Sequence, residues 1–366
     1  MRGPILFAQA AEGGQEFVGR WRGQPWVFCC VLAHTDTCLI PGLSAAGMSE
    51  DLRAYTPAAD AEVVHAGRPR CLPRLPSHPS GVPGPAAITR AALGLAGIQA
   101  YFVAAGLRVW PDAGVQLRRV ACEPGGSLVE GHAVPAAAFL FEQGCGIGRE
   151  LAAGGARYLV LGESVPGGTT TALALLLSLG VEAGGRVSGS VPDNAHTLKA
   201  SVAERGLSAA GLSPGAGQTD PLRAAACVGD PMQPLAAGIV AAATEGGLDV
   251  LLGGGSQMVA VAALLAALRG AHSLDRVALG TTRWVVEDPG ADVAGLAADV
   301  RRDLPLLAVN LDFSRSRHAC LHAYERFLVK EGVGAGGACL AALLSTGATL
   351  AELEEAIDGA YANVLG

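Results

Sequence analysis

The segment Leu159-Val-Leu-Gly-Glu-Ser-Val-Pro-Gly-Gly-Thr-Thr-Thr171 passes from an apolar run through a glycine-rich turn into a group of threonines. The apolar run, Arg157–Leu161, predicts a buried strand, and Thr169–Leu179 after the turn predicts a helix. A strand joined to a helix by a tight turn is the unit from which parallel sheets are built. This segment therefore predicts an α/β protein.

The same alternation of strand and helix continues through most of the chain. Apolar runs predict further strands at Trp26–Ala33, Ala61–Ala66, Tyr101–Ala105, Asp249–Leu252, Arg276–Gly280 and Leu306–Leu311. Helices are predicted at Ala86–Leu95, Val134–Ala152, Asp193–Arg205 (with Asp193 and Asn194 as candidate N-caps), Asp230–Thr244, Ser256–Leu268 and Asp292–Arg302, and Pro73–Pro85 predicts a loop. We expect a Rossmann-like, mostly parallel sheet flanked by helices, with ligands beyond the carboxyl ends of the strands.

The chain beyond Phe313 predicts helices only, at Ala319–Lys330, Ala338–Leu344 and Leu350–Val364. We therefore expect a large α/β nucleotide-binding domain over residues 1–315 and a small helical lobe over residues 316–366. The placement of the N-terminal residues stays open between the domain and the lobe.

Composition narrows the class of protein. Half of the 366 residues are hydrophobic and 16% are charged, which excludes a disordered or fibrous chain. A net charge of −7 argues against a nucleic-acid partner, which needs a basic face. The apolar runs are shorter than the ~20 residues that span a bilayer, and Met1–Glu16 lacks a signal-peptide pattern. Nine irregularly spaced cysteines without a CxxC pair predict free thiols, no metal site and a cytoplasmic location.

The glycine-rich turn is the strongest candidate for a binding site. Gly167 and Gly168 allow close approach of a ligand, and Thr169 and Thr170 open a helix whose free N–H groups suit a phosphate. A βα turn with a threonine N-cap explains the pattern equally well. The GxxxxGK[ST] pattern of a P-loop is absent.

Four further features are weaker signals when each is considered by itself. Gly253-Gly-Gly-Ser256 repeats the strand–turn–helix pattern, so that two such turns together favour a phosphorylated ligand. Glu163 ends a strand and Lys199 lies on a helix, where the alternative is a solvated side chain. Glu331 precedes four glycines in six residues, a carboxylate beside a flexible backbone that suits a general base or an exposed hinge.

Taken in order, these motifs resemble the nicotinate-nucleotide–dimethylbenzimidazole phosphoribosyltransferase family of cobalamin nucleotide-loop assembly. The chain looks closest to the branch found in archaea and cyanobacteria, with which it shares Ile40–Gly47, Tyr55–Asp60 and Glu163–Thr171. Val329-Lys-Glu-Gly-Val-Gly-Ala-Gly336 is similar to the family segment Leu-Gly-Glu-Gly-Thr-Gly-Ala-Ala, and Lys199 occupies a place similar to a family lysine.

The resemblance implies a glycosyltransferase of the pentosyltransferase class. It would move the ribose 5-phosphate of nicotinate mononucleotide to a benzimidazole or purine base and give an α-ribotide for the lower ligand of cobalamin. Glu331 is implied as the catalytic base, and Glu163 as a catalytic carboxylate near the positive charge that develops on the ribose. The implied substrate- or phosphate-binding residues are Gly167, Gly168, Thr169, Thr170, Lys199, Gly253, Gly254, Ser256, Gly332 and Gly334.

The chain also departs from the family pattern. The Ala-Asp-His-Gly-type segment is not found, the turn reads Val165-Pro-Gly-Gly168 instead of Gly-Ile-Gly-Asn, and Val333 replaces a threonine. The acceptor stays open among dimethylbenzimidazole, adenine and other bases. Two other functions also stay open: a mononucleotide-binding protein without transfer activity, and a nucleotide N-glycosidase. The resemblance implies no metal or redox cofactor, and it implies a homodimer.

Overall fold

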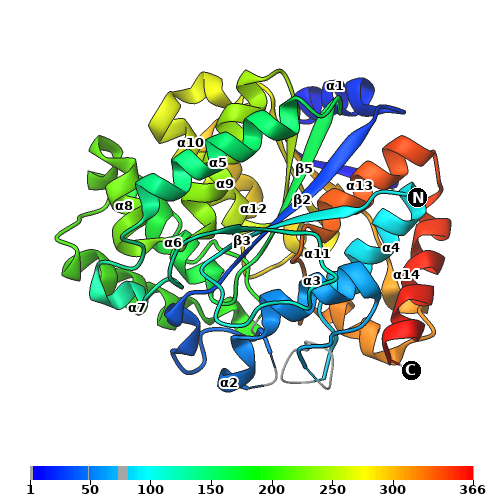
Figure 1. Ribbon diagram of the computed structural model, residues 1–366, viewed down its shortest axis with the longest axis horizontal. Coiled ribbons are helices and arrows are strands. Elements are labelled where there is room, and N and C mark those ends of the chain that lie inside the picture. Colours follow the sequence, from blue (N-terminus) through cyan, green and yellow to red (C-terminus); the bar gives the residue numbers. More distant parts are fainter. Residues whose placement is uncertain (1–2, 48, 73–80, 191, 366) are drawn as a thin grey trace.

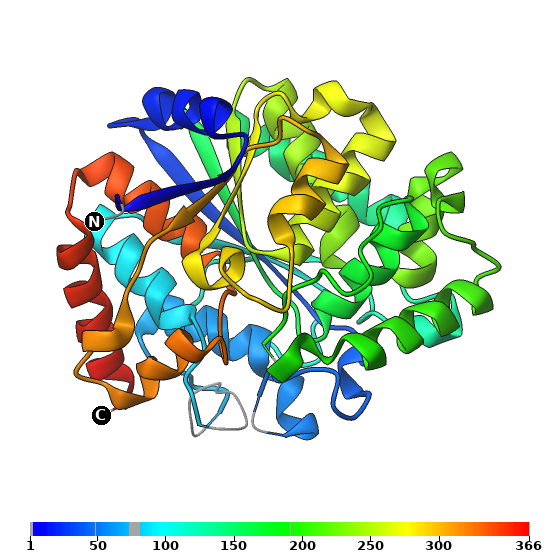
Figure 2. The ribbon, with the colours of Figure 1, turned by 180° about the vertical axis from the view of Figure 1, so that it is seen from behind.

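The computed structural model describes residues 3–47, 49–72, 81–190 and 192–365. Its strands are β1 (Ile5–Gln9), β2 (Trp26–Ala33), β3 (Ala100–Ala105), β4 (Leu117–Val120), β5 (Tyr158–Ser164), β6 (Asp249–Gly253), β7 (Val277–Thr282) and β8 (Leu306–Val309). They form one eight-stranded sheet in the order β1-β8-β7-β6-β5-β2-β3-β4. Figure 2 shows β1, in dark blue, at the edge beside β8; this pair is antiparallel and the others are parallel. The predicted α/β class is confirmed.

Helices cover both faces of the sheet (Figure 1). One face carries α5 (Ala137–Ala152), α6 (Gly168–Ser178), α7 (His196–Ala209), α8 (Pro221–Val228), α9 (Met232–Glu245), α10 (Ser256–Arg269) and α12 (Val293–Val300). The other carries α1 (Ala11–Trp21), α3 (Thr56–Ala66), α4 (Ala86–Ala96), α13 (Ala335–Thr346) and α14 (Leu350–Leu365). Cys29 and Val31 of β2 point into the first core, and Phe28 and Cys30 into the second. This alternation makes a continuous apolar strand buried on both sides.

The C-terminal helices lie against a helix from the N-terminal third of the chain. Both α13 and α14 pack on α4, and α13 also contacts β5, β6, β7 and β8 (Figure 1). The division into a domain and a lobe at residues 315 and 316 stays a prediction.

Small residues let α13 lie directly on the sheet. A Cβ on Gly336 would come within 2.1 Å of the Thr281 carbonyl carbon, and one on Gly334 within 2.9 Å of the Gly162 Cα. Gly334 also has φ 67°, a left-handed conformation that glycine adopts without steric cost. The segment before α13 is thereby held against the carboxyl ends of β5 and β7.

The order of the strands reverses between β2 and β5. From β2 the sheet extends through β3 to β4, and from β5 it extends through β6 and β7 to β8. In open α/β sheets, ligands bind at the carboxyl edge of such a reversal. The topology of this sheet therefore directs attention to the loops after β2 and β5.

Most predicted elements match the structure, including β2 with its predicted bounds. Ala61–Ala66 was predicted as a strand and is wrong, since these residues end helix α3. Asp60, Glu62 and the apolar residues of α3 are almost all buried, so that the helix has no polar face for periodicity to reveal. Strands β1 and β4 and helices α1 and α8 were not predicted. Residues 73–80 of the predicted loop Pro73–Pro85 lie outside the described residues.

Two predicted helix bounds are also wrong. Asp193 and Asn194 are not N-caps of α7, because the helix begins at His196 and the residue at its cap is Ala195. Asp193, Asn194 and Ala195 all have left-handed backbone angles. The predicted helix Ala319–Lys330 is a 3₁₀ helix that ends at Arg326, so that Lys330 lies in a loop.

Candidate active site

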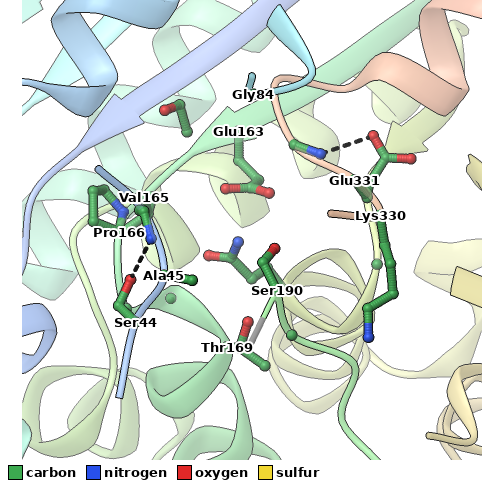
Figure 3. A pocket seen from close by; sticks show the side chains of 18 of the residues that line it. Ser44, Ala45, Gly84, Glu163, Val165, Pro166, Thr169, Ser190, Lys330 and Glu331 are labelled. Atoms are coloured by element: carbon green, nitrogen blue, oxygen red, sulfur yellow. Dashed lines mark hydrogen bonds between the residues drawn. The ribbon is translucent and has the colours of Figure 1, made fainter. Parts of the chain in front are cut away.

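A cavity opens at the carboxyl edge of the sheet, beside the reversal between β2 and β5 (Figure 3). Its walls come from segments that are far apart in the chain: residues 43–47, Thr56, Asp60, 84–85, 163–169, 188–190, Lys199, 255–257, Val285 and 329–333. The parallel fold brings the ends of β5, β6 and β7 to this one edge. The cavity is therefore where the sheet topology predicts a ligand.

Glu331 lies in the loop just before α13, with its carboxylate at the N-terminus of that helix. The backbone N–H of Gly336 donates to both carboxylate oxygens at 3.2 Å, and that of Gly332 donates to Oε1 at 3.1 Å. Thr281 Oγ1, at the end of β7, donates to Oε2 at 3.2 Å. Helix N–H groups and the hydroxyl thus fix the orientation of this carboxylate.

The surroundings of Glu331 set its proton affinity. Burial raises the pKa of Glu331 to about 7, and the N–H groups of Gly332 and Gly336 oppose the rise. A carboxyl group with a pKa near neutrality exchanges protons readily at physiological pH, which is the property a general base needs.

Glu163 is the next-to-last residue of β5 and lies in the same part of the cavity as Glu331 (Figure 3). Burial raises the pKa of Glu163 to about 8, and the negative charges of Asp230, Glu331 and Asp60 add to the rise. The backbone ties the two glutamates together, because the N–H of Val333 donates to the Glu163 carbonyl at 2.9 Å. The loop that bears Glu331 is therefore fixed to the strand that bears Glu163.

A third buried carboxyl group lines the same part of the cavity. Asp60 of α3 accepts a hydrogen bond from Ser164 Oγ at 2.8 Å, and burial raises its pKa to about 7. A nearby positive charge would stabilise the ionised form of each of these three carboxyl groups. This end of the cavity is suited to a cationic group.

The glycine-rich turn forms another wall of the cavity. Gly167 has φ 80° and precedes the first residue of α6, and a Cβ there would come within 2.9 Å of the Cys38 backbone. Among the described residues, no side chain caps the N-terminus of α6, and Thr169 faces the cavity. The N–H groups of Gly168 and Thr170 already donate to the Val165 and Gly167 carbonyls, so that the positive end of the helix dipole is what attracts an anion here. Thr170 lies outside the lining, and its buried hydroxyl has no partner among the described residues.

Lys199 and Lys330 both line the cavity, and both donate to Asn194. Lys199 is 1% exposed, and its Nζ donates to the Asn194 carbonyl at 2.5 Å. Lys330 is 4% exposed, and its Nζ donates to Asp288 Oδ2 at 2.5 Å and to Asn194 Oδ1 at 2.9 Å. Burial lowers the pKa of Lys199 to about 8, with a further contribution from the positive charge of Lys330. Of these two buried ammonium groups, Lys330 bonds a carboxylate and Lys199 bonds a backbone carbonyl.

The two kinds of charge lie at different ends of the cavity. In Figure 3, Glu163 and Glu331 lie at the top, and the Lys330 side chain runs away from them so that its Nζ lies near the bottom. Ser190 and Thr169 lie toward the same lower part. The arrangement suits a ligand with a cationic part and an anionic part some distance apart.

Eight of the predicted site residues line this cavity: Glu163, Gly167, Gly168, Thr169, Lys199, Ser256, Glu331 and Gly332. Thr170, Gly253, Gly254 and Gly334 do not line it. A Cβ on Gly253 would come within 3.1 Å of the Gly334 Cα, so that these two glycines serve close packing beneath the site.

Sequence reasoning missed several lining residues. They are Ser44, Thr56, Asp60, Ser164, Gln257 and Lys330. Tyr55–Asp60 was noted as a shared motif, but the strand expected directly after it hid the position of Asp60. Lys330 directly precedes the predicted base, and this adjacency is the signal that could have identified it.

The described residues lack two features that would point to other kinds of function. They contain no group of three or more His, Cys, Asp or Glu side chains arranged to hold a metal ion. Among the same residues, no helix is long and apolar enough to cross a membrane.

Sequence comparison identifies relatives of this chain. A family model described as phosphoribosyltransferase matches residues 85–291. A UPF0284 protein of Methanothermobacter thermautotrophicus is 43% identical over 87% of this chain and 88% of its own length. Another, of Gloeobacter violaceus, is 44% identical over 93% of this chain and 89% of its own. An archaeon and a cyanobacterium are the sources that the motifs predicted.

Structural comparison identifies a solved structure with the same fold. The crystal structure of nicotinate-nucleotide–dimethylbenzimidazole phosphoribosyltransferase from Thermus thermophilus matches with a TM-score of 0.60 and 22% identity. The match covers 94% of this chain and 90% of that one. This likeness shows a shared fold.

Proposed function

Because this chain belongs to the phosphoribosyltransferase family, we propose that it moves the ribose 5-phosphate of nicotinate mononucleotide to a benzimidazole or purine base. The product would be an α-ribotide that serves as the lower ligand of cobalamin. The observation that carries the proposal is the division of charge in the cavity. Carboxyl groups at one end suit the cationic nicotinate–ribose bond, and lysines at the other end suit the phosphate.

The proposed transfer is a displacement at C1′ of the ribose. A ring nitrogen of the acceptor attacks C1′, and the bond from C1′ to the nicotinate nitrogen breaks. The electron pair of that bond passes to the nicotinate nitrogen and neutralises its positive charge. Glu331 takes the N–H proton of the acceptor, so that the ribotide product is not left as a cation.

Glu163 would act on the charge that develops on the ribose. A bound cation lowers the pKa of a nearby carboxyl group, so that the donor converts Glu163 from a neutral acid to a carboxylate. That carboxylate then stabilises the positive charge at C1′ as the bond to nicotinate lengthens. Gly167, Gly168 and Thr169 would hold the phosphate at the N-terminus of α6, with Lys199 beside them.

A turnover assay tests this function. Wild-type protein is incubated with nicotinate mononucleotide and, in turn, dimethylbenzimidazole, adenine, other purines or no base. We expect nicotinate release that depends on the base, together with an α-ribotide identified by mass and anomeric NMR signals. Release at the same rate without any base would instead show the N-glycosidase. Binding by calorimetry without turnover on any base would show a mononucleotide-binding protein.

We also propose that the protein is a homodimer and that it is cytoplasmic. Light scattering should then give about twice the chain mass of 36.8 kDa. A mass equal to that of one chain at micromolar concentration would contradict the dimer.

A further inference from the structure

The two lysines at the cavity are the only lysines in the chain. Of the 26 basic residues, 24 are arginine, and Lys199 and Lys330 are the remaining two. Both are buried, and both line the same cavity. A chain that uses arginine at every other basic position thus places its compact ammonium groups together at one site.

Together the two lysines carry more positive charge than the one nearby carboxylate, Asp288, balances. Asp288 Oδ2 accepts from Lys330 Nζ, and it also accepts from Ser188 Oγ at 2.9 Å and from Asn194 Nδ2 at 3.0 Å. Lys199 has no carboxylate partner among the described residues, only the carbonyl of Asn194. Two ammonium groups and one carboxylate leave one positive charge in a buried place, which an anion would neutralise.

Counting hydrogen-bond donors leads to the same conclusion. An ammonium group has three N–H donors. Within the described residues, Lys199 uses one donor and Lys330 uses two. Lys199 therefore has two N–H donors left and Lys330 has one. Buried donors without partners are costly, so these three donors favour a ligand with several acceptor oxygens. A phosphate group has them.

The position of Lys330 in the chain relates this anion site to the base. The residue after Lys330 is Glu331, and neighbouring threonines at the end of β7 hold both. Thr282 Oγ1 donates to the Lys330 carbonyl, and Thr281 Oγ1 donates to the Glu331 carboxylate. A ligand held by the Lys330 ammonium is therefore held at a set distance from Glu331.

We propose that Lys330 is a second phosphate ligand that acts with Lys199, and that this pair makes the site select a ribotide donor over the corresponding riboside. The identity of the donor rests on the proposed function, whereas the existence of the two-lysine anion subsite does not. Asp288 and Asn194 hold Lys330 in place when the subsite contains no anion.

Lysine NMR tests the subsite without any turnover. Protein grown with [ε-¹³C]lysine should give two lysine signals, which Lys199→Arg and Lys330→Arg assign. We expect inorganic phosphate to shift both signals along one saturation curve, and chloride at equal ionic strength to shift neither. A phosphate titration that moves only the Lys199 signal, or neither signal, overturns the proposal. This result stands even if no acceptor base is ever found.

Kinetics then test the selection of the donor. Lys330→Met is paired with Asp288→Asn, so that no buried carboxylate is left without a partner, and Arg302→Met outside the cavity lining serves as the surface control. We expect kcat/KM for nicotinate mononucleotide to fall about 10- to 100-fold, mainly through KM. For nicotinate riboside the change should stay below about 3-fold, and Lys330→Arg should restore part of the loss. Equal losses for both donors would show a structural role and overturn the proposal.

Discussion

At the scale of single residues, the site depends on carboxyl groups whose pKa values are raised by burial. Glu331 and Glu163 are both shifted toward neutrality, and for both groups burial is the largest cause. Hydrogen bonds from the N-terminus of α13 partly restore the acidity of Glu331, whereas neighbouring negative charges shift Glu163 further. The pKa of Glu163 is thus shifted by burial and by neighbouring charges together, whereas hydrogen bonds oppose the shift of Glu331.

The raised pKa of Glu331 predicts how the transfer rate depends on pH. A general base works only when deprotonated. With both substrates saturating, so that the bound donor keeps Glu163 ionised, kcat should rise about tenfold per pH unit below about 7 and level off above it. The profile is measured from pH 5 to 9. A rate that is constant from pH 5 to 7 would show that no group with this pKa acts as the base.

The raised pKa of Glu163 predicts how stability depends on pH. The folded protein keeps this proton up to about pH 8, whereas the unfolded chain releases it near its ordinary value of 4.5. The contribution of Glu163 to the free energy of unfolding is therefore largest below about pH 4.5. This contribution falls as the pH rises toward 8, by up to about 1.4 kcal/mol per pH unit.

Glu163→Gln removes that titration and leaves the shape of the side chain. We expect the variant to show a flatter stability profile and to exceed wild type by on the order of 1 kcal/mol or more at pH 8. Urea denaturation of both proteins between pH 5 and 8 measures the difference. Asp60 and Glu331 remain in both proteins, so that their contributions to the two stability profiles are the same. Parallel profiles would therefore mean that the pKa of Glu163 is not raised in the folded protein.

The residue scale is also where the sequence predicted least. Glu331 and Glu163 were named from motifs, but burial of a charged side chain leaves no local pattern. Lys199 had the solvated side chain as its alternative and is 1% exposed. Lys330 was missed because its helix was predicted to continue through a segment that is a loop. Asp288 and Asn194 hold Lys330 from distant parts of the chain.

At the scale of elements, the close packing of α13 on the sheet determines where Glu331 lies. The helix begins with small residues, and its first turn donates N–H groups to the carboxylate. Periodicity predicted this helix with a later start, at Ala338 instead of Ala335. It did not predict the close contact, because contact between a helix and distant strands depends on tertiary structure.

Replacing Gly336 tests this contact. In Gly336→Ala the new Cβ would come within 2.1 Å of the Thr281 carbonyl carbon, so that α13 or β7 must move. We expect a loss of about 2–4 kcal/mol of stability. We also expect at least a tenfold loss of kcat, since the N–H that orients Glu331 moves too.

Gly359→Ala in α14 is the matched control, since nothing lies within 4 Å of its new Cβ. It should stabilise the protein by about 0.5–1 kcal/mol, because alanine favours a helix interior, and leave kcat unchanged. Thermal denaturation and the transfer assay measure both variants. Similar behaviour of the two variants would refute a role for α13 in positioning the base.

At the scale of the whole molecule, the parallel sheet brings distant segments to one edge. The strand–turn–helix alternation was sufficient to predict the α/β class and the edge at which ligands bind. It could not predict edge strand β1, whose antiparallel partner β8 lies some 300 residues away along the chain. The family motifs led to the hypothesis of ribose 5-phosphate transfer. The separation of carboxyl groups and lysines within the cavity supports that hypothesis.

The decisive test of the proposed transfer is the ratio of α-ribotide formed to nicotinate released in the presence of the preferred base. Wild type should give a ratio of one at every time point. Glu331→Gln should keep its affinity for nicotinate mononucleotide and lose roughly 100- to 10,000-fold in rate. A ratio well below one would show that water takes the ribose, and an unchanged rate in Glu331→Gln would show that the base lies elsewhere.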